Sequence, residues 1–413
     1  MDKNIIAPHS LAVGRKESAF FEDLQSNEDV LNDQIRGSKI LVIGGAGSIG
    51  SNTIGTIANY KPKSLHVVDQ NENGLAELVR NLRSREGGFE VDDFRTLPLN
   101  YGGRAFELFL KENSPYDYVL NFAALKHVRS EKDPYSILEM LNTNLVLMSG
   151  LLSRFKNLGA PKKFFSVSTD KAANPSSVMG ATKRLMEHFM FDAQLERPQD
   201  MKTTSARFAN VAYSNGSLLQ SFENRFSLGQ PLVAPKDCER YFVSLNESGH
   251  ICTLASFVAP ENTIVIPNLD PRKNLVKLED ALYGFLEFKG YEPELFSSES
   301  EARCAVPSSN AKGKWPILLT PLDTAGEKPY EEFVGKDEQE LEIGLSELRG
   351  VSYKAAKPGA VLKVKQRLSD IMGCDIEDAA QLTKVELVEL IATVEPEFLR
   401  THKVSESNLD QRM

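Results

Sequence analysis

Short apolar, β-branched runs alternate with segments of helical periodicity through the first half of the chain, and this alternation most constrains the fold. The runs between residues 39 and 211 read KILVIG, SLHVVD, FRTLPL, YDYVLNF, KKFFSVS and TSARFANV. Such alternation is typical of βαβ units, and runs this apolar indicate strands that helices cover on both faces. We therefore predict an α/β fold built on a doubly wound parallel sheet of the Rossmann type.

The patterning along the 413 residues predicts four segments. Residues 1–36 are polar and acidic, with a short amphipathic stretch, and form an N-terminal arm. Residues 37–210 form the Rossmann domain. Residues 211–357, where strands, helices and loops mix, form a smaller α/β lobe that binds the substrate and is interleaved with the Rossmann domain. Residues 358–413 form a helical C-terminal extension and a polar tail.

Composition excludes several classes of function. The 48 basic and 57 acidic residues give a net charge of −9, which opposes nucleic acid and anionic membranes as partners. No apolar stretch approaches the ~18–20 residues that span a bilayer, and the first residues lack the pattern of a secretory signal. The four dispersed cysteines form no CxxC motif, so we expect no metal and no disulfide framework. A soluble cytoplasmic protein without membrane insertion is predicted.

A glycine-rich loop follows the first predicted strand and opens a helix. It reads Gly44-Gly45-Ala46-Gly47-Ser48-Ile49-Gly50, and Asp69 ends the next strand nineteen residues after Gly50. Glycine permits the tight turn and a close backbone approach to a pyrophosphate, which then lies at the helix N-terminus, while an Asp in this place holds a ribose diol. We predict an NAD site contacted by Gly44, Gly47, Ser48, Ile49, Gly50 and Asp69. NAD is favoured over NADP because Asp69 repels a 2′-phosphate. The structural alternative is a tight turn without a ligand.

Two further motifs bear a family resemblance. Residues 168–175 read STDKAANP, and residues 179–184 read MGATKR. They resemble the extended short-chain dehydrogenase/reductases, and within them the UDP-N-acetylglucosamine 4,6-dehydratases of bacterial polysaccharide synthesis. Most of that superfamily has a Tyr four residues before the Lys that corresponds to Lys183, and here Met179 takes its place. The combination resembles a branch that often carries an N-terminal membrane domain, which we expect this chain to lack.

The resemblance extends from about Gly37 to Phe333. Further matching motifs are AALKHV (123–128), NTN (142–144), RFANV (207–211), GS (216–217), RYF (240–242) and GEKPYEE (326–332). The chain departs from the family pattern at Asn100, where relatives usually have an Asp beside the adenine, and at Ala209, which replaces a Gly. Residues 266–320 do not follow the pattern, which leaves the identity of the substrate open.

The resemblance implies a role for each matching residue. Asp170 would handle the proton delivered to the C6 oxygen of a hexose, Lys171 would be the base at C5, and Thr169 would hydrogen-bond the C4 oxygen. Lys183 would hold the nicotinamide ribose. Because a thioether has no exchangeable proton, Met179 cannot take the C4 hydroxyl proton, and we favour Asp170 for that step. The alternative for Asp170 and Lys171 is an Asx-type turn with a solvated lysine.

Binding residues follow from the same resemblance. The remaining cofactor candidates are Asn100, Ala123, Lys126 and Asn144, and the substrate candidates are Met179, Arg207, Asn210 and Arg240. Each of Arg207, Asn210 and Arg240 could equally form a structural contact such as an ion pair. For Lys126 and the neighbouring His127 the alternative is a purely structural role in the fold. The charged residues of GEKPYEE could instead cap and solvate a helix.

The sequence therefore predicts an NAD-dependent dehydratase for a nucleotide-linked N-acetylhexosamine such as UDP-N-acetylglucosamine. Oxidation at C4 makes the C5 proton acidic, so that a base can remove it while the C6 hydroxyl leaves as water and the hydride returns to C6. The alternatives are a nucleotide-sugar epimerase acting at C4 or C5, and an NAD-binding regulator without catalysis. A homodimer or a higher homo-oligomer is expected from the resemblance.

Overall fold

Nine strands form the main sheet of the computed structural model, which describes residues 12–126, 131, 133–322, 328–374 and 381–402. The strands are β1 (Lys39–Ile43), β2 (Ser64–Asp69), β3 (Asp93–Pro98), β4 (Tyr118–Asn121), β5 (Lys163–Val167), β6 (Lys202–Ala206), β10 (Thr263–Pro267), β14 (Glu340–Leu341) and β15 (Leu348–Ser352). Their order is β14-β15-β10-β6-β5-β4-β1-β2-β3. The strands from β3 to β10 are parallel, which confirms the predicted Rossmann-type sheet. The antiparallel β15 and β14 extend one edge.

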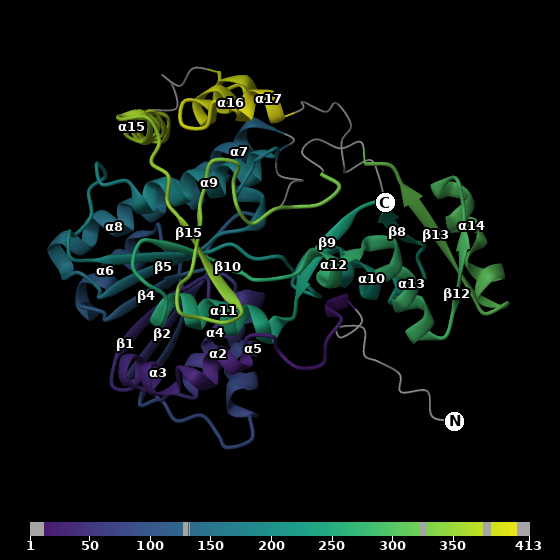
Figure 1. Cartoon of the computed structure of the whole chain (residues 1–413), viewed down its shortest axis with the longest axis horizontal. Helices are drawn as coiled ribbons and strands as arrows, with labels where there is room; N and C mark the ends of the chain where they lie inside the picture. Colours follow the sequence, from purple (N-terminus) through teal and green to yellow (C-terminus); the bar gives the residue numbers. More distant parts are fainter. Residues whose placement is uncertain (1–11, 127–130, 132, 323–327, 375–380, 403–413) are drawn as a thin grey trace.

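Helices cover both faces of this sheet (Figure 1). One face carries α6 (Arg104–Asn113), α7 (Pro134–Leu141), the π-helical η2 (Asn142–Val146), α8 (Leu147–Leu158) and α9 (Val178–Phe191). The other carries α2 (Phe21–Ser26), α3 (Glu28–Ile35), α4 (Ser48–Ala58), α5 (Glu72–Arg83) and α11 (Leu245–Phe257). Every residue of β4 and β5 is buried, because apolar side chains pack against helices on both sides of these strands.

Residues 20–35 of the N-terminal arm pack into the core on one face of the main sheet. Phe20, Leu31 and Ile35 are fully buried among the residues of α4 and α11. The carboxylate of Asp23 accepts the backbone N–H groups of Ser346 at 2.7 Å and Glu347 at 2.9 Å, just before β15. These contacts join the start of the described chain to the antiparallel edge of the sheet.

A smaller lobe lies beside the main sheet, on the right in Figure 1. It contains β7 (Asn210–Val211), β8 (Leu232–Pro235), β9 (Glu239–Val243), β11 (Leu275–Lys277), β12 (Glu292–Leu295) and β13 (Lys314–Thr320), with helices α10 (Leu218–Ser227), α12 (Pro271–Asn274), α13 (Leu278–Lys289) and α14 (Glu299–Asn310). The strands form two sheets, with the orders β12-β13-β8 and β11-β9-β7. Phe222, Phe285 and Trp315 belong to the core between them and the helices. The predicted lobe boundaries stay predictions, and β10, β14 and β15 return to the main sheet.

The C-terminal extension folds back over α7 and α9, at the top of Figure 1. Its helices are α15 (Ala360–Gly373), α16 (Lys384–Ala392) and α17 (Phe398–Thr401), so the predicted helical character is confirmed. Val361, Val364 and Leu368 of α15 are buried at helical spacing, and every residue of α9 is buried. The extension therefore helps to bury α9, the helix that carries Met179 and Lys183.

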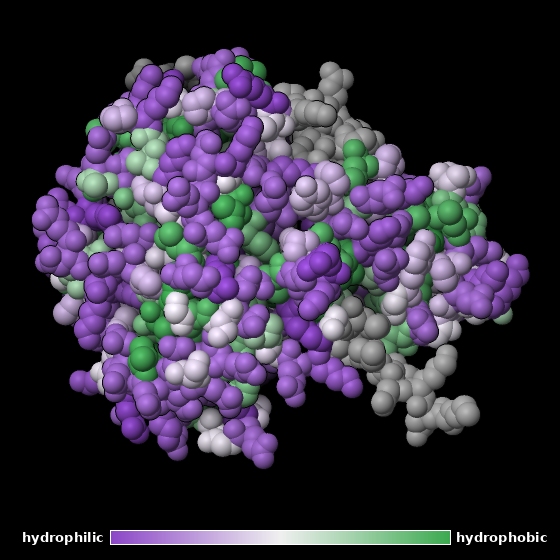
Figure 2. Space-filling view, viewed as in Figure 1, coloured by the Kyte–Doolittle hydropathy of each residue, from purple (hydrophilic) through white to green (hydrophobic). Residues whose placement is uncertain are grey.

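The surface is mostly hydrophilic on the face drawn in Figure 2, with apolar residues in small separate groups. Across the described ranges, no helix combines the length and the apolar character that a membrane crossing requires.

We expect Ile391→Ala to lower the free energy of unfolding by about 2–5 kcal/mol, since Ile391 is fully buried on α16 and its loss leaves a cavity. Val385→Ala on the same helix is the control, because Val385 is 65% exposed and should change that free energy by less than about 0.5 kcal/mol. Denaturant unfolding followed by circular dichroism measures both. Equal values for the two variants would contradict the docking of α16 on the core.

Candidate active site

A cavity of about 870 Å³ opens at the carboxyl ends of the parallel strands and reaches the smaller lobe. Its walls come from the loops after β1, β2, β3, β4 and β5, from α7, η2 and α9, and from residues within 208–219, 235–242 and 278. Ligands bind at this end of the sheet in open α/β folds. A comparison of the lining residues with the predicted site residues therefore shows which of the predicted residues can contact a ligand in this cavity.

The glycine loop lies where the sequence pattern predicts, between β1 and α4. Gly44 has φ +76°, and a Cβ there would lie 2.4 Å from the backbone nitrogen of Ala123. A Cβ on Gly50 would lie 2.7 Å from the carbonyl oxygen of Gly44. Side chains are thus excluded at both positions, because Gly44 packs directly against the chain after β4 and Gly50 packs against the backbone of the loop itself. All five predicted loop residues line the cavity: Gly44, Gly47, Ser48, Ile49 and Gly50.

Asp69 also lines the cavity, at the end of β2. Its Oδ2 accepts the backbone N–H of Ala46 at 2.9 Å, and its Oδ1 accepts that of Asn71 at 2.9 Å. The carboxylate therefore holds the glycine loop in place. Each oxygen retains a further lone pair that can accept a hydrogen bond from a ligand.

The remaining cofactor candidates differ in position. Ala123 and Lys126 line the cavity, and burial lowers the pKa of Lys126. Asn144 is not among the lining residues: its amide bonds the backbone of Leu125 and the hydroxyl of Thr182, so it braces the loop after β4 against α9. Asn100 is also outside the lining, and its Oδ1 accepts the N–H of Gly102. His127 lies outside the described residues.

The predicted proton-transfer residues follow β5 in one turn, residues 169–174, which we call the Asp170 turn. It begins with the short 3₁₀ helix η3 (Asp170–Ala172). Oδ1 of Asp170 accepts the Thr169 hydroxyl at 2.8 Å, the Lys171 backbone N–H at 2.9 Å and the Lys171 ammonium at 3.1 Å. Thr169 and Lys171 line the cavity, whereas Asp170 is only 2% exposed and lies behind them. The turn thus presents a hydroxyl and an amine that share one carboxylate.

Helix α9 brings Met179 and Lys183 to the same cavity. A Cβ on Gly180 would lie 2.5 Å from the carbonyl oxygen of Lys171, so this glycine lets the helix approach the Asp170 turn. The Lys183 ammonium donates to the carbonyl oxygen of Val167 at 3.0 Å, and burial lowers the pKa of Lys183 to about 8.

Asn210 and Arg240 line the part of the cavity near the smaller lobe. Oδ1 of Asn210 lies 3.5 Å from the Lys171 ammonium. Nη1 of Arg240 donates to the carbonyl oxygens of Lys328 at 3.0 Å and Pro329 at 3.1 Å. Arg240 therefore ties this part of the cavity to the chain segment that follows residue 327.

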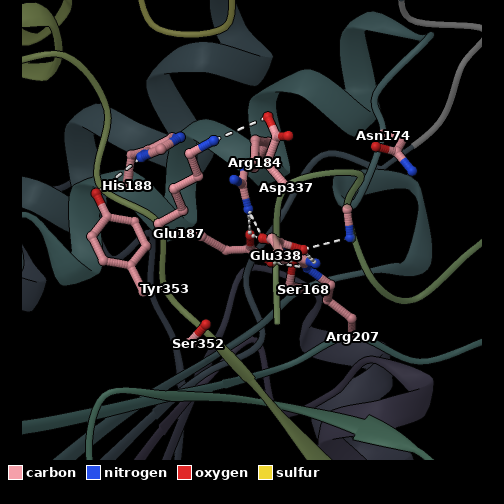
Figure 3. A network of polar contacts seen from close by, with 12 residues as sticks. Ser168, Asn174, Arg184, Glu187, His188, Arg207, Asp337, Glu338, Ser352 and Tyr353 are labelled. Carbon is pink, nitrogen blue, oxygen red and sulfur yellow. Dashed lines mark hydrogen bonds and ion pairs between the residues drawn. The ribbon is translucent and has the colours of Figure 1, made fainter. Parts of the chain in front are cut away.

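Arg207 does not reach the cavity, unlike the other predicted substrate residues. It is fully buried and belongs to a cluster of charges, the Arg207 cluster, formed with Arg184, Glu187, Glu338 and Ser168. Its guanidinium donates to both carboxylate oxygens of Glu187 at 2.6 and 2.7 Å and to those of Glu338 at 2.5 and 2.8 Å. Figure 3 shows both arginines converging on Glu338 beside Ser168. The structural ion pair, left open by the sequence, is what the structure contains at this position.

The charged groups of this cluster shift one another's pKa values. Burial alone would raise the pKa of Glu338, but its hydrogen bonds to Arg207 and the two guanidinium charges lower that pKa to about 2. Burial likewise opposes the charge on Arg207, yet the two carboxylates raise its pKa above the ordinary value. The guanidinium of Arg184 also donates to Glu395 of the C-terminal extension at 3.0 Å. The cluster therefore joins β5, β6, α9 and the extension behind the cavity.

Sequence reasoning missed three buried or partly buried carboxylates near the site. Glu338 and Glu395 pair with Arg184, and Glu331 is 4% exposed among the charges of Lys171, Lys328 and Arg240. The only available signal was the motif GEKPYEE, which contains Glu331 but reads equally well as a solvated helix cap. Gly326 and Glu327 of that motif lie outside the described residues.

Comparison with known proteins supports the reading of the motifs. The profile of a family described as "Polysaccharide biosynthesis protein" matches residues 40–351. An uncharacterized membrane protein of Methanocaldococcus jannaschii is 33% identical over 62% of this chain and 74% of its own length. The probable polysaccharide biosynthesis protein EpsC of Bacillus subtilis is 27% identical over 72% of this chain and 52% of EpsC. This chain thus spans about half the length of that relative.

Two further comparisons concern an enzyme and a fold. The inverting UDP-N-acetylglucosamine 4,6-dehydratase of Campylobacter jejuni strain 81-176 is 27% identical over 61% of this chain and 73% of that enzyme. The X-ray structure of Pen from Bacillus thuringiensis superposes with a TM-score of 0.62 and 23% identity, over 78% of this chain and 90% of Pen. At this identity the structural likeness concerns the fold alone.

We expect Glu187→Gln to lower the free energy of unfolding by about 3–5 kcal/mol, because it leaves the buried Arg207 charge without one of its two carboxylates. The control is Glu196→Gln, since Glu196 forms an exposed pair with Lys156 at 3.8 Å and an exposed hydrogen bond with the Ser153 hydroxyl at 3.4 Å, and should contribute less than about 1 kcal/mol. Denaturant unfolding of both variants checks the difference. A Glu187→Gln protein as stable as the control would show that the cluster does not hold the two strands and α9 together.

Proposed function

The chain belongs to this polysaccharide biosynthesis family, and we propose that it is an NAD-dependent nucleotide-sugar 4,6-dehydratase whose substrate is UDP-N-acetylglucosamine. The observation that carries the proposal is the Asp170 turn, which presents a hydroxyl and an amine bonded to one carboxylate at the wall of a cavity that the glycine loop also lines. The similarity to the Campylobacter dehydratase supports this reaction class.

The residues around the glycine loop fit a dinucleotide. Gly44 and Gly50 let the loop pack tightly against neighbouring backbone, and α4 begins at Ser48 on the cavity wall, so that its N-terminus can take up a pyrophosphate. Asp69 would accept hydrogen bonds from the adenosine ribose, and Lys183 would hold the nicotinamide ribose. When bound, NAD would supply hydride transfer, by accepting a hydride from C4 of the sugar and returning it to C6.

We assign the proton transfers of this reaction to residues of the Asp170 turn. The Thr169 hydroxyl lines the cavity and bonds the Asp170 carboxylate, so it can pass the proton of the C4 hydroxyl to Asp170. Lys171, as the neutral amine, takes the proton from C5 and becomes an ammonium. Asp170 then returns its proton through the Thr169 hydroxyl to the C6 hydroxyl, which leaves as water, and the ammonium returns a proton to C5. The protein thus ends each turnover in its starting protonation state.

Met179 borders the cavity without taking part in these proton transfers, because its thioether carries no exchangeable proton. Asn210 and Arg240 would contact the sugar and the diphosphate. We also retain the prediction of a homo-oligomer, whose test is the mass of the protein in solution.

Incubation with UDP-N-acetylglucosamine in heavy water, without added NAD, tests the proposed reaction. We expect a product that has lost one water, carries a methyl group at C6 and contains solvent deuterium at C5, because the C5 proton leaves to Lys171. Mass spectrometry and proton NMR of the product measure all three properties.

Other outcomes would identify the alternatives. A C4 epimerase leaves the mass unchanged and incorporates no deuterium, and a C5 epimerase incorporates deuterium without losing water. Loss of water without deuterium at C5 would contradict the Lys171 step. Absence of any reaction with UDP- or GDP-linked hexosamines would favour an NAD-binding regulator.

Substitutions in the Asp170 turn and on α9 distinguish residues that transfer protons from a residue that only packs against the substrate. We expect Lys171→Met and Asp170→Asn each to lower kcat by about 10²–10⁴-fold, as is typical when a general acid or base is lost. Met179→Leu should keep much of the activity, since a similar apolar volume remains. Initial rates at saturating substrate measure all three variants, and a Met179→Leu enzyme as inactive as Asp170→Asn would refute this division of roles.

Cofactor choice depends on Asp69. We expect Asp69→Ala to weaken NAD binding by about 10- to 100-fold and to reduce the preference for NAD over NADP. The reason is that a charged acceptor for the ribose diol is lost. Asp69→Asn keeps an acceptor for the Ala46 N–H and controls for loosening of the glycine loop. Calorimetric titration with NAD and NADP measures both variants, and an unchanged preference in Asp69→Ala would rule out the ribose role.

A further inference from the structure

A short link, residues 175–177, joins the Asp170 turn to α9. The turn places Thr169 and Lys171 on the cavity wall, and α9 places Met179 and Lys183 there. The two groups of side chains belong to separate elements that only this link connects directly along the chain. The course of the link therefore affects how far apart the two groups lie.

The end of the C-terminal extension contacts this link. The hydroxyl of Thr401 donates to the carbonyl oxygen of Pro175 at 2.7 Å. Nδ1 of His402 lies 3.0 Å from the carbonyl oxygen of Ser176, and because a carbonyl oxygen can only accept, this ring nitrogen carries the proton and donates it. We call Thr401 and His402 the 401–402 clamp. Two consecutive carbonyl groups of the link are thus held by two consecutive residues of the extension.

The clamp is anchored by packing. His402 is 8% exposed, and its ring stacks on that of Phe398 in α17 with the ring centroids 4.8 Å apart. Phe398 is buried in the hydrophobic core that also contains Leu185 and Phe189 of α9. The imidazole that bonds the link is therefore fixed against the same body of the protein as α9.

The chain on each side of the clamped residues is held by other contacts. The carbonyl oxygen of Asn174 accepts the ammonium of Lys328. The side chain of Asn174 donates to Glu332 at 2.8 Å and accepts the backbone N–H of Lys336 at 3.0 Å. After the link, the side chain of Ser177 caps the N-terminus of α9. The clamp thus acts on the two residues that separate a fixed turn from a fixed helix start.

The clamp lies outside the part of the chain that the family profile matches. That match ends at residue 351, whereas the clamp is formed by residues 401 and 402. The profile match therefore gives no indication that the end of the extension contacts the chain beside the Asp170 turn. This contact is visible only in the folded protein.

We propose that Thr401 and His402 are positioning residues that set the place of the Asp170 turn relative to α9. Neither residue is among those that line the cavity, so both act through the link. The consequence for catalysis rests on the proposed function: Lys171 and Lys183 would have to meet the same sugar and cofactor. A misplacement of about 1 Å between reacting groups can lower a rate by about 100-fold.

Two double variants separate the hydrogen bonds of the clamp from its packing. Thr401→Val with His402→Leu, the donor-free variant, removes both donors and keeps apolar side chains of similar volume. Thr401→Ser with His402→Asn, the donor-retaining variant, keeps a hydroxyl and places an amide N–H near the position of Nδ1. Thr393→Val is the matched control, because the Thr393 hydroxyl also belongs to the extension but donates to Glu389 of its own helix at 3.3 Å.

The first measurement is the initial rate of dehydration of UDP-N-acetylglucosamine. We expect the donor-free variant to lower kcat by about tenfold and to change KM by less than about twofold, because the link sets the geometry of the reacting groups. Asn210 and Arg240, which would contact the substrate, lie on other segments of the cavity wall. The donor-retaining variant and the control should keep kcat within about twofold of the unmodified protein.

The second measurement uses the full chain without substrate. Hydrogen exchange, followed by peptide mass spectrometry, reports on the backbone N–H groups of Ala172 and Ala173, which bond carbonyl oxygens within the turn at 3.1 Å. In the donor-free variant, peptides from residues 168–183 should exchange about tenfold faster, because the loss of two hydrogen bonds eases local opening. Peptides from β4 are the internal reference and should exchange at an unchanged rate.

The outcomes separate this inference from the proposed function. Faster exchange confined to α16 and α17 would mean that the clamp only fastens the extension, and the inference would be wrong. It would also be wrong if both double variants lost kcat equally, or if the donor-free variant kept its full kcat. Faster exchange of residues 168–183 in the donor-free variant of a protein that does not dehydrate UDP-N-acetylglucosamine would support the clamp and refute the reaction.

Discussion

The pairing of Arg207 with Glu187 and Glu338 is the interaction on which the arrangement of the cavity depends. A fully buried guanidinium is costly, and only the complete set of carboxylate hydrogen bonds compensates for its desolvation. Such a cluster adds little net stability over apolar packing, but it tolerates only one geometry. Because its members come from the residue directly after β6, from α9 and from the chain before β14, this geometry fixes the three parts of the chain relative to one another.

The cavity inherits its shape from this arrangement. Ser168, which ends the strand run before the Asp170 turn, donates to Glu187 at 2.6 Å, so the cluster also sets where the turn begins. Helix α9 then approaches the turn closely enough that only a glycine fits at position 180. The positions of Lys171 and Lys183 are therefore set by direct contact between the backbone of α9 and the backbone of the Asp170 turn.

The C-terminal extension completes the same layer. Glu395 bonds both Arg184 and His188 on α9, and the hydroxyl of Thr401 donates to the carbonyl oxygen of Pro175 at 2.7 Å, directly after the Asp170 turn. The helical spacing of apolar residues predicted the helices of the extension, whereas their place on α9 could not be predicted. That place is decided by apolar packing on the core together with polar contacts between residues about two hundred positions apart.

The sequence alone determined the parts of this protein that arise from local spacing. The alternation of apolar runs specifies the parallel sheet, and the glycine loop with Asp69 lies where the pattern predicts, because strand, turn and helix follow one another within some thirty residues. Only the tertiary structure decided which charged residues face the cavity. Arg207 and Arg240 are both arginines in recognisable motifs, yet one is turned into a buried cluster and the other lines the cavity. The physical reason is that a buried charge takes its role from its partners, and those partners come from distant parts of the chain.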